Sequence, residues 1–312
     1  MVPDTSYKNP SQNKTAHLFP AFVPEYLGTE IKTLEHYGIN IHTYLEKASE
    51  ITSMDLCNFD IETNNFLDNQ LISQYIPYII SCCISDILSS RNIQPDYVAS
   101  YSMGIYAALY HCGSVDFKTG LLMIKKAYSC VENNLPDTTS SMCVIGGLSY
   151  EDVEALIRSF QADVFIINQN SEFSFLLSGN KKVLIKVLEN ATAIGALQAR
   201  MLPVTHPYHA PFLKNASVEF HNELLSMKIT GNRYSLISAI DNHIIINKEE
   251  IITELTRNIY CGFNWYSLIT FLLKNGVSTF IECGAGESLY KMGKFIEGDF
   301  VIYNLKKLNK VC

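Results

Sequence analysis

The chain has 312 residues, of which 47% are hydrophobic and 18% are charged, and its formal net charge is −7. This composition indicates a folded globular protein with about two domains, or one domain with a subdomain. The negative charge argues against nucleic acid as a partner. The nine cysteines form no C-x-x-C pair, and their odd number does not suggest a disulfide framework. We therefore expect reduced thiols in a cytoplasmic protein, and no metal site.

The N-terminal residues and the most apolar stretch of the chain bear on where the protein acts. Residues 1–15 are polar and lack the apolar core of a signal peptide, so we expect a disordered tail there. The most apolar stretch, residues 75–88, is interrupted by Pro77 and Asp86 and is too short to span a bilayer. The sequence thus predicts a protein that has no membrane partner.

The first hundred residues predict alternating strands and helices. A short strand over residues 15–20 ends at a proline and leads through a loop into a helix that starts near Tyr26. Apolar residues spaced by three and four predict a helix over residues 68–89. The apolar residues 97–99 predict the end of a strand, and residues 104–110 are helix formers without a breaker.

Ser102 lies between that last strand and helix, at the tip of a predicted tight turn. The first N–H groups of a helix have no intrahelical partner and point toward such a position. A serine hydroxyl there is suited to act as a nucleophile beside an oxyanion pocket. The S-x-S-x-G motif is weak by itself, because a serine before a helix is more often a plain N-cap.

The middle of the chain has a different rhythm. Residues 116–131 predict a helix that residues 133–137 break. The elements that follow have the order β-α-β-β-α-β, over residues 142–148, 150–160, 164–168, 173–177, 181–193 and 197–204. This is the split βαβ order of a ferredoxin-like fold. The sequence predicts a small subdomain over residues 138–204, inserted into a core of residues 16–137 and 205–312.

Two histidines, His206 and His209, follow the subdomain in a segment that prolines stiffen. One interpretation is that both are partly buried loop histidines. The other six histidines have no comparable rigid frame, so this segment is the best source of a base for Ser102.

The last third of the chain returns to alternating elements. It predicts strands over residues 235–240, 279–283 and 300–303, with helices over residues 248–259 and 265–274. Such alternation predicts a mainly parallel sheet, with a site at the carboxyl ends of its strands.

Motifs over residues 16–305 occur in the order of a known family. Residues 100–108 match G-H-S-x-G-E-Y-A-A, residues 19–25 match F-P-G-Q-G-S-Q, and residues 203–209 match P-V-S-x-x-x-H. Residues 168–171 with 177–179 match N-x-N-S…SG, and residues 281–286 match I-E-x-G-P-G. The chain thereby resembles the malonyl-CoA:acyl carrier protein transacylases and the acyltransferase domains of polyketide synthases. The resemblance implies a hydrolase-like α/β core with an inserted ferredoxin-like subdomain.

The resemblance also implies roles for individual residues. Ser102 would be the nucleophile and His209 its base, in a ping-pong cycle through an acyl-serine. The backbone carbonyl of Asn258 would orient His209, and the backbone N–H groups of Phe22 and Met103 would form the oxyanion hole. Further residues would contact the substrate: Gln70, Tyr101, Ala127, Asn168, His206 and Tyr208.

The sequence departs from the family at the acyl-binding side. A count from Ser102 places Ala127 where similar enzymes have the arginine that binds the malonyl carboxylate, and alanine cannot replace that bidentate contact. Tyr101 stands at the family's histidine, which makes the pocket more apolar. We therefore expect an acyl group other than malonyl. Residues 206–209 point the other way, because they resemble an H-A-F-H segment that accompanies malonyl in polyketide acyltransferases.

Three functions follow from the resemblance. The first is transfer of an acyl group between thioesters of acyl carrier protein or coenzyme A, in polyketide or fatty-acid-like biosynthesis, including that of antibiotics. The second is an acyl hydrolase that clears carrier proteins of a trans-acyltransferase polyketide pathway. The third is a carrier-protein-binding relative without activity. An α/β-hydrolase is disfavoured, because the inserted subdomain occupies the interval in which its acid would lie.

The resemblance implies the partners as well. We expect acyl carrier protein and acyl-CoA or acyl-ACP as partners through their phosphopantetheine thioesters, no bound cofactor, and a monomer. Carrier proteins are acidic and this chain is acidic overall, so docking requires a local basic face. Two groups of lysines could supply it: Lys181, Lys182 and Lys186, or Lys291 and Lys294. For any single lysine, a solvated helix face is the plainer interpretation.

Overall fold

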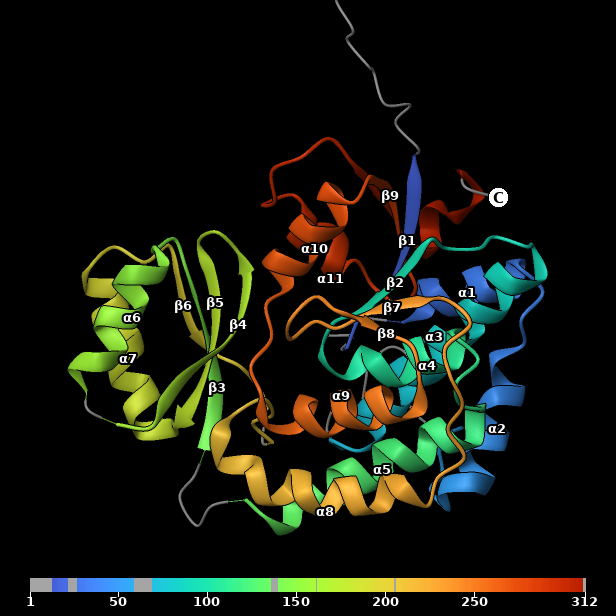
Figure 1. The fold of residues 1–312 in the computed structure, drawn as a ribbon, viewed down its shortest axis with the longest axis horizontal. Coiled ribbons are helices and arrows are strands. Elements are labelled where there is room, and N and C mark those ends of the chain that lie inside the picture. The colour runs from blue at the N-terminus through green and yellow to red at the C-terminus, as the bar shows by residue number, and fades with distance from the viewer. Residues whose placement is uncertain are drawn as a thin grey trace, which may run out of the picture.

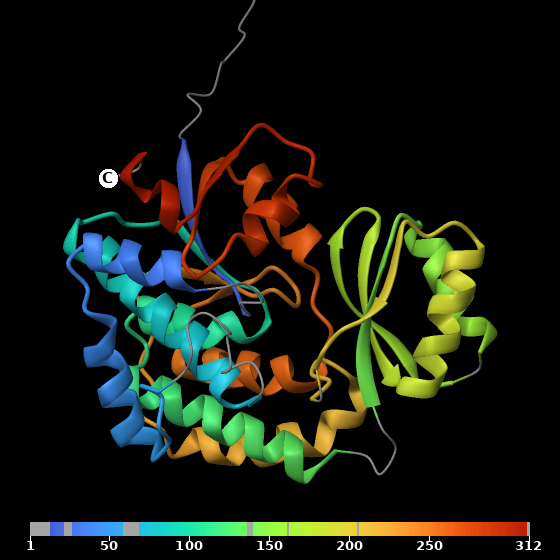
Figure 2. The same ribbon diagram turned by 180° about the vertical axis from the view of Figure 1, so that it is seen from behind.

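The computed structural model describes residues 13–21, 27–58, 69–135, 140–160, 162–204 and 206–310. These residues form an α/β core and a smaller four-stranded subdomain beside it (Figure 1 and Figure 2). The predicted fold class, a mainly parallel sheet with an inserted ferredoxin-like subdomain, is confirmed.

The core is built on a six-stranded sheet with the order β10-β9-β1-β2-β7-β8. Its strands are β1 (Lys14–Phe19), β2 (Tyr97–Ser100), β7 (Ser235–Ile237), β8 (Ile244–Ile245), β9 (Val277–Glu282) and β10 (Val301–Tyr303). All pairs are parallel except β7 with β8. Phe19 pairs with Ser100, so the carboxyl ends of β1 and β2 meet at one edge of the sheet.

Alternate residues of the core strands face two different hydrophobic clusters, as the pleat of a strand requires. Phe19 and Val98 face the larger cluster, whereas Leu18 and Ala99 face the smaller one. The larger cluster packs against α1 (Gly28–His36), α2 (Ile41–Thr52), α3 (Ile72–Ser90), α4 (Ile105–His111), α5 (Phe117–Asn133), α8 (Lys214–Leu225) and α9 (Lys248–Tyr260). The smaller one packs against α10 (Trp265–Lys274) and α11 (Ser288–Gly293). Short 3₁₀ turns complete the core: η2 (Ser102–Gly104), η3 (Pro211–Leu213) and η4 (Leu305–Lys310).

The subdomain is an antiparallel sheet with the order β4-β5-β3-β6 and two helices. Its elements are β3 (Ser140–Gly146), α6 (Tyr150–Ser159), β4 (Val164–Ser171), β5 (Ser174–Asn180), α7 (Lys181–Ala193) and β6 (Gln198–Met201). Both helices cover one face of the sheet. Residues of the other face form a small cluster with Ala210 and Phe212, which follow His209. The subdomain therefore packs on the segment that carries the candidate base.

Several predicted boundaries differ from the structure. β1 begins at Lys14, which pairs with Val277, so Lys14 and Thr15 belong to the sheet rather than to the expected tail. Residues 1–12 of that tail lie outside the described residues. β4 and β5 are longer than predicted because they pair with each other along most of their length, and β7 is shorter because the chain turns after Ile237. The helices α2, α8 and α11 and the two-residue strand β8 were not predicted.

Two general features of the described residues complete this picture. Their eight cysteines are free thiols, six of which are buried. No helix in the described ranges is both long enough and apolar enough to cross a bilayer.

Candidate active site

Ser102 lies two residues beyond the end of β2, in the 3₁₀ turn that leads into α4. Its φ is 52°, in the left-handed region that residues other than glycine rarely adopt. Such strained backbone is found where the surrounding structure holds a residue in one functional position. The turn therefore presents the serine at the carboxyl edge of the sheet, as the sequence predicts.

Contacts between the turn and the end of β1 hold Ser102 in place. The N–H of Tyr101 donates to the carbonyl of Phe19 at 2.9 Å. Gly104 lies so close to this carbonyl that a Cβ at position 104 would overlap it. Only glycine lets the start of α4 approach β1 this closely, which explains the glycine of the S-x-S-x-G motif.

His209 approaches Ser102 from the segment that follows the subdomain. The Ser102 Oγ and the His209 Nε2 are 2.6 Å apart, although the two residues are 107 positions apart in the chain. His209 also has a positive φ, of 67°, and its N–H donates to the carbonyl of Ile259 at 2.8 Å. Both partners of the pair are thus held by their backbones in unusual conformations.

The environment of His209 keeps its imidazole neutral. The residue is 2% exposed, and the ring of Phe263 lies 4.8 Å from its own, centroid to centroid. Burial lowers the pKa of His209 to about 4, although the backbone carbonyls of Cys261 and Asn258 act in the opposite direction. A neutral imidazole whose Nδ1 carries the proton leaves Nε2 free to accept the proton of Ser102.

The contacts of Nδ1 bear on how the ring is oriented. Nδ1 is buried and finds no hydrogen bond of ordinary geometry among the described residues, so the carbonyls of Cys261 and Asn258 act on it at longer range. The sequence predicts the carbonyl of Asn258 in this role, and the structure places that of Cys261 beside it as the stronger influence. Cys261 was missed because only its main chain is involved, which leaves no signal in residue type.

The predicted oxyanion donors are placed in part. Met103 follows Ser102 and precedes the first 3₁₀ hydrogen bond of the turn, from Gly104 N–H to the Tyr101 carbonyl at 2.9 Å. Its N–H therefore belongs to the unpaired first turn of the helix. Phe22, the second predicted donor, lies outside the described residues.

Comparison with known proteins adds the following findings. No family model matches the sequence. The malonyl CoA-acyl carrier protein transacylase of Staphylococcus aureus strain MRSA252 is 21% identical over 308 residues, covering 96% of this chain and 97% of that protein. The protein of the same name from Synechocystis is 25% identical over 301 residues, covering 95% and 98%.

Solved structures agree with these relatives over the whole fold. The acyl-carrier-protein S-malonyltransferase of Burkholderia pseudomallei superposes with a TM-score of 0.87 at 23% identity, covering 96% of this chain and 99% of that one. A malonyl-transacylase solved in complex with a type II polyketide synthase acyl-carrier protein has a TM-score of 0.80 at 22% identity, covering 93% and 95%. The chain belongs to the malonyl-CoA:acyl carrier protein transacylase family. Transacylases are acyltransferases.

Tyr101, which stands where this family has a histidine, is built into a buried hydrogen-bonded group. Its hydroxyl donates to Asn170 Oδ1 at 2.8 Å and accepts from Asn168 Nδ2 at 3.0 Å, while Asn168 Oδ1 accepts the N–H of Trp265 at 3.0 Å. Burial raises the pKa of Tyr101 above its usual range, so the phenol stays protonated. Tyr101 thereby joins the core to β4 of the subdomain directly beside Ser102. Asn170, which lies in the family's N-x-N-S motif, was not singled out from the sequence.

Ala127, at the position of the family's carboxylate-binding arginine, is completely buried on α5. Its neighbours in sequence do not replace that arginine. Lys125 Nζ lies 3.4 Å from the carbonyl of Thr52, and Lys126 Nζ forms an ion pair with Glu223 at 2.9 Å. Both lysines are therefore engaged away from Ser102.

Tyr208 lies on the same side of α5 as Ala127. Burial raises its pKa above the usual range, and its hydroxyl lies close enough to Gln74 and Cys130 for electrostatic contact. Because Cys130 is three residues after Ala127, both occupy one face of the helix. Tyr208 therefore brings its ring to the region that an arginine at position 127 would enter.

His206 and Gln70 contact each other at the start of α3. His206 Nδ1 lies 2.9 Å from Gln70 Oε1, and its ring lies 4.5 Å from that of Tyr128, centroid to centroid. Burial lowers the pKa of His206, against the effect of Glu132. These contacts place His206 in a structural cluster two residues from Tyr208 and three from His209, so it lines the same segment without meeting Ser102.

The described residues hold no group of three or more histidines, cysteines, aspartates or glutamates arranged to bind a metal. The chemistry of the site is argued below from the side chains and backbone groups just described.

Proposed function

We propose that the protein transfers an acyl group between phosphopantetheine thioesters through an acyl-Ser102 intermediate. The observation that carries this proposal is the 2.6 Å contact between Ser102 Oγ and His209 Nε2 in a family of acyltransferases. A nucleophile within hydrogen-bond reach of a neutral, buried base is the arrangement that serine acyl transfer requires. A carrier-protein-binding relative without activity would have no need to hold both residues in strained backbone.

Each half of the proposed reaction balances on these groups. His209 Nε2 takes the proton of Ser102 as Oγ bonds to the thioester carbonyl carbon, and the carbonyl electron pair moves to oxygen. Collapse of the tetrahedral intermediate breaks the C–S bond, and the leaving thiolate takes the proton from His209. A second thiol then reverses these steps on the acyl-serine.

The N–H of Met103 is the described donor suited to stabilise the tetrahedral oxyanion. It belongs to the same turn as the nucleophile, so attack and charge stabilisation are set by one piece of backbone. The reaction draws its proton transfers from His209 alone and calls for no bound cofactor.

The proposed partner is an acyl carrier protein. This rests on the relatives, which are named as carrier-protein transacylases, and on the neighbour solved together with a carrier protein. Acyl-CoA and acyl carrier protein present the same phosphopantetheine thioester, so one site serves for donor and acceptor.

The proposed acyl group has no free carboxylate, in contrast to the malonyl group in the relatives' names. Ala127 is buried, and both flanking lysines are engaged elsewhere. A carboxylate brought to this side of Ser102 would lose its hydration without gaining the bidentate partner that arginine supplies. The proposal therefore favours acetyl or longer acyl chains.

Hydrolysis is a second candidate function, and the same alanine favours it. A site that does not select malonyl is suited to remove other acyl groups from a carrier protein. The two activities differ only in whether water or a pantetheine thiol attacks acyl-Ser102.

The test is intact-protein mass after mixing with malonyl-, acetyl- and longer acyl-pantetheine thioesters, for the wild type, Ser102→Ala and a matched surface control, Ser226→Ala. We expect an adduct from acetyl or longer chains in the wild type and in Ser226→Ala, and none in Ser102→Ala. Persistence of the adduct until carrier protein is added indicates a transferase, and decay in buffer indicates a hydrolase. A malonyl adduct that forms as fast as the acetyl adduct would contradict the proposed acyl specificity.

A further inference from the structure

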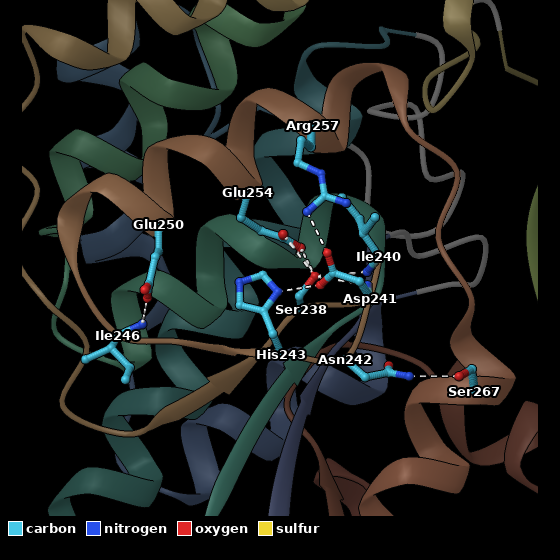
Figure 3. Close-up of polar contacts among 10 residues, drawn as sticks. All are labelled: Ser238, Ile240, Asp241, Asn242, His243, Ile246, Glu250, Glu254, Arg257 and Ser267. Atoms are coloured by element: carbon cyan, nitrogen blue, oxygen red, sulfur yellow. Dashed lines mark hydrogen bonds and ion pairs between the residues drawn. The ribbon is translucent and has the colours of Figure 1, made fainter.

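A polar turn between β7 and β8 lies against the C-terminal half of α9 (Figure 3). Ser238 Oγ donates to the carboxylate of Glu254, 2.9 Å from each oxygen, and accepts the N–H of Ile240 at 3.1 Å. Ser238 is fully buried and Glu254 is 3% exposed. A buried carboxylate is stable only when it is hydrogen-bonded, so this contact fixes the turn to the helix.

An ion pair one turn further along α9 strengthens this attachment. Arg257 Nη1 lies 2.7 Å from Asp241 Oδ2, and the other carboxylate oxygen of Asp241 contacts His243 Nδ1. Partial burial raises the pKa of Asp241, but the hydrogen bonds from His243 and Arg257 outweigh it and hold that pKa well below the usual range. Asp241 is thus a carboxylate that carries its full charge at neutral pH, and Figure 3 shows Arg257 and Glu254 reaching it and Ser238 from one helix.

The same turn also holds the start of α10. Asn242 has a φ of 62°, and its Nδ2 donates to Ser267 Oγ at 2.8 Å. The N–H of Asn264 donates to the carbonyl of Ala239 at 2.9 Å. Residues 238–243 therefore attach to α9 on one side and to α10 on the other, and we call these six residues the bracket.

The connection between α9 and α10 is the part of the chain on which His209 rests. The Ile259 carbonyl accepts the His209 N–H at 2.8 Å, and the carbonyls of Asn258 and Cys261 act on the imidazole. The ring of Phe263 packs against that of His209 at 4.8 Å. Every backbone contact described above for the base thus comes from the seven residues between Arg257 and Asn264.

Arg257 joins the bracket to this connection directly. Its carbonyl accepts the N–H of Cys261 at 2.7 Å, which closes the last turn of α9, while its guanidinium is held by Asp241. The last turn of a helix has unpaired carbonyls and frays unless a side chain fixes it. A cation in this turn is also favoured by the helix dipole.

We propose that Asp241 is a positioning residue for the base: through Arg257 it fixes the end of α9, and thereby the carbonyls that orient His209 toward Ser102. This rests on the proposed function insofar as orientation is read out as a rate. Displacing a catalytic group by about 1 Å can lower a rate by roughly 100-fold, so a partial loosening of the bracket is expected to reduce the acylation rate by roughly 10-fold. Substrate binding, which does not involve the bracket, is expected to stay unchanged.

The test compares Asp241→Asn, Arg257→Gln and Arg257→Lys with the wild type at a temperature far below unfolding. We expect kcat for Ser102 acylation to fall roughly 10-fold in Asp241→Asn and Arg257→Gln with KM unchanged, and Arg257→Lys to recover part of the loss. The matched control is Glu223→Gln, which removes the ion pair of similar exposure between α5 and α8 and is expected to leave kcat unchanged.

A second readout does not depend on activity. In protein with ¹⁵N-labelled histidine, with the His209 signals assigned through His209→Gln, we expect the wild type to show an imidazole protonated at Nδ1. Asp241→Asn is expected to show a mixture of tautomers, and Glu223→Gln is expected to match the wild type. An unchanged His209 spectrum in both Asp241→Asn and Arg257→Gln overturns the inference, whether or not the wild type transfers acyl groups. Absence of any serine-dependent adduct in the wild type counts against the proposed function instead.

Discussion

The two sides of Ser102 differ in how much of the family's pattern they retain. On the side of the reaction, the strained serine, the close-packed Gly104 and the buried His209 form a complete nucleophile and base. On the side of the acyl group, Ala127 and Tyr101 replace the arginine and histidine of similar enzymes. Geometry at the reacting atoms constrains which reaction occurs, while the surrounding side chains select the group that is transferred. The difference indicates retained chemistry with altered recognition.

The largest expected effect tests the reaction side. Ser102→Ala should lower the acyl-transfer rate by on the order of 10⁴-fold, and His209→Gln by a similar factor, because the two side chains act as a unit. The double variant should therefore be little worse than either single one, as measured by steady-state transfer to carrier protein. Ser226→Ala and His221→Gln serve as controls on the surface of α8. Additive losses in the double variant would mean that the pair does not act together.

The pH dependence of kcat/KM follows from the burial of His209. Its pKa is lowered to about 4, so the free enzyme keeps its base deprotonated at pH values where an exposed histidine, with a pKa near 6.5, would be protonated. We expect kcat/KM to be level down to about pH 5 and to fall about tenfold per pH unit below 4. An acid limb near pH 6.5, in a buffer series in which the protein stays folded, would mean that the base is more hydrated than the structure implies.

The acyl side is tested by Ala127→Arg, which restores the family's cation. A bidentate contact to a carboxylate is worth about 1.5 to 3 kcal/mol, so the ratio of malonyl to acetyl adduct formation should rise by roughly 10-fold or more. Ala48→Arg, at an equally buried alanine of α2, controls for the general cost of placing arginine in the core. If the ratio stays at its wild-type value in folded Ala127→Arg, position 127 does not face the acyl group.

The smallest expected effect concerns carrier-protein docking. Lys181, Lys182 and Lys186 lie on α7 with exposed or largely exposed side chains. Reversing all three charges to glutamate should raise the KM for carrier protein a few-fold and leave that for a free pantetheine thioester unchanged. Lys228→Glu is a single-charge control away from α7. An unchanged carrier-protein KM would remove α7 from the docking surface and direct attention to Lys291 and Lys294.

The sequence predicted most of the elements that carry the site. The helices α7 and α10 have the predicted bounds, because each begins after an asparagine whose side chain accepts an N–H of the first turn, Asn180 from Lys182 and Asn264 from Ser267. The turn at Ser102 was predicted from a strand followed at once by helix formers. In contrast, β8 was missed because two residues carry no periodicity, and its pairing with β7 depends on the bracket between them.

The sequence by itself determined the fold class, the subdomain order and the identity of the nucleophile and base, because these depend on local patterns and on motifs that residue types express. Only the tertiary structure decided how the base is held. The carbonyls of Asn258, Ile259 and Cys261 are main-chain groups that any side chain would accompany, so no residue type announces them. Their position is set by contacts between segments far apart in the chain, in which Asp241 meets Arg257 and Ser102 meets His209.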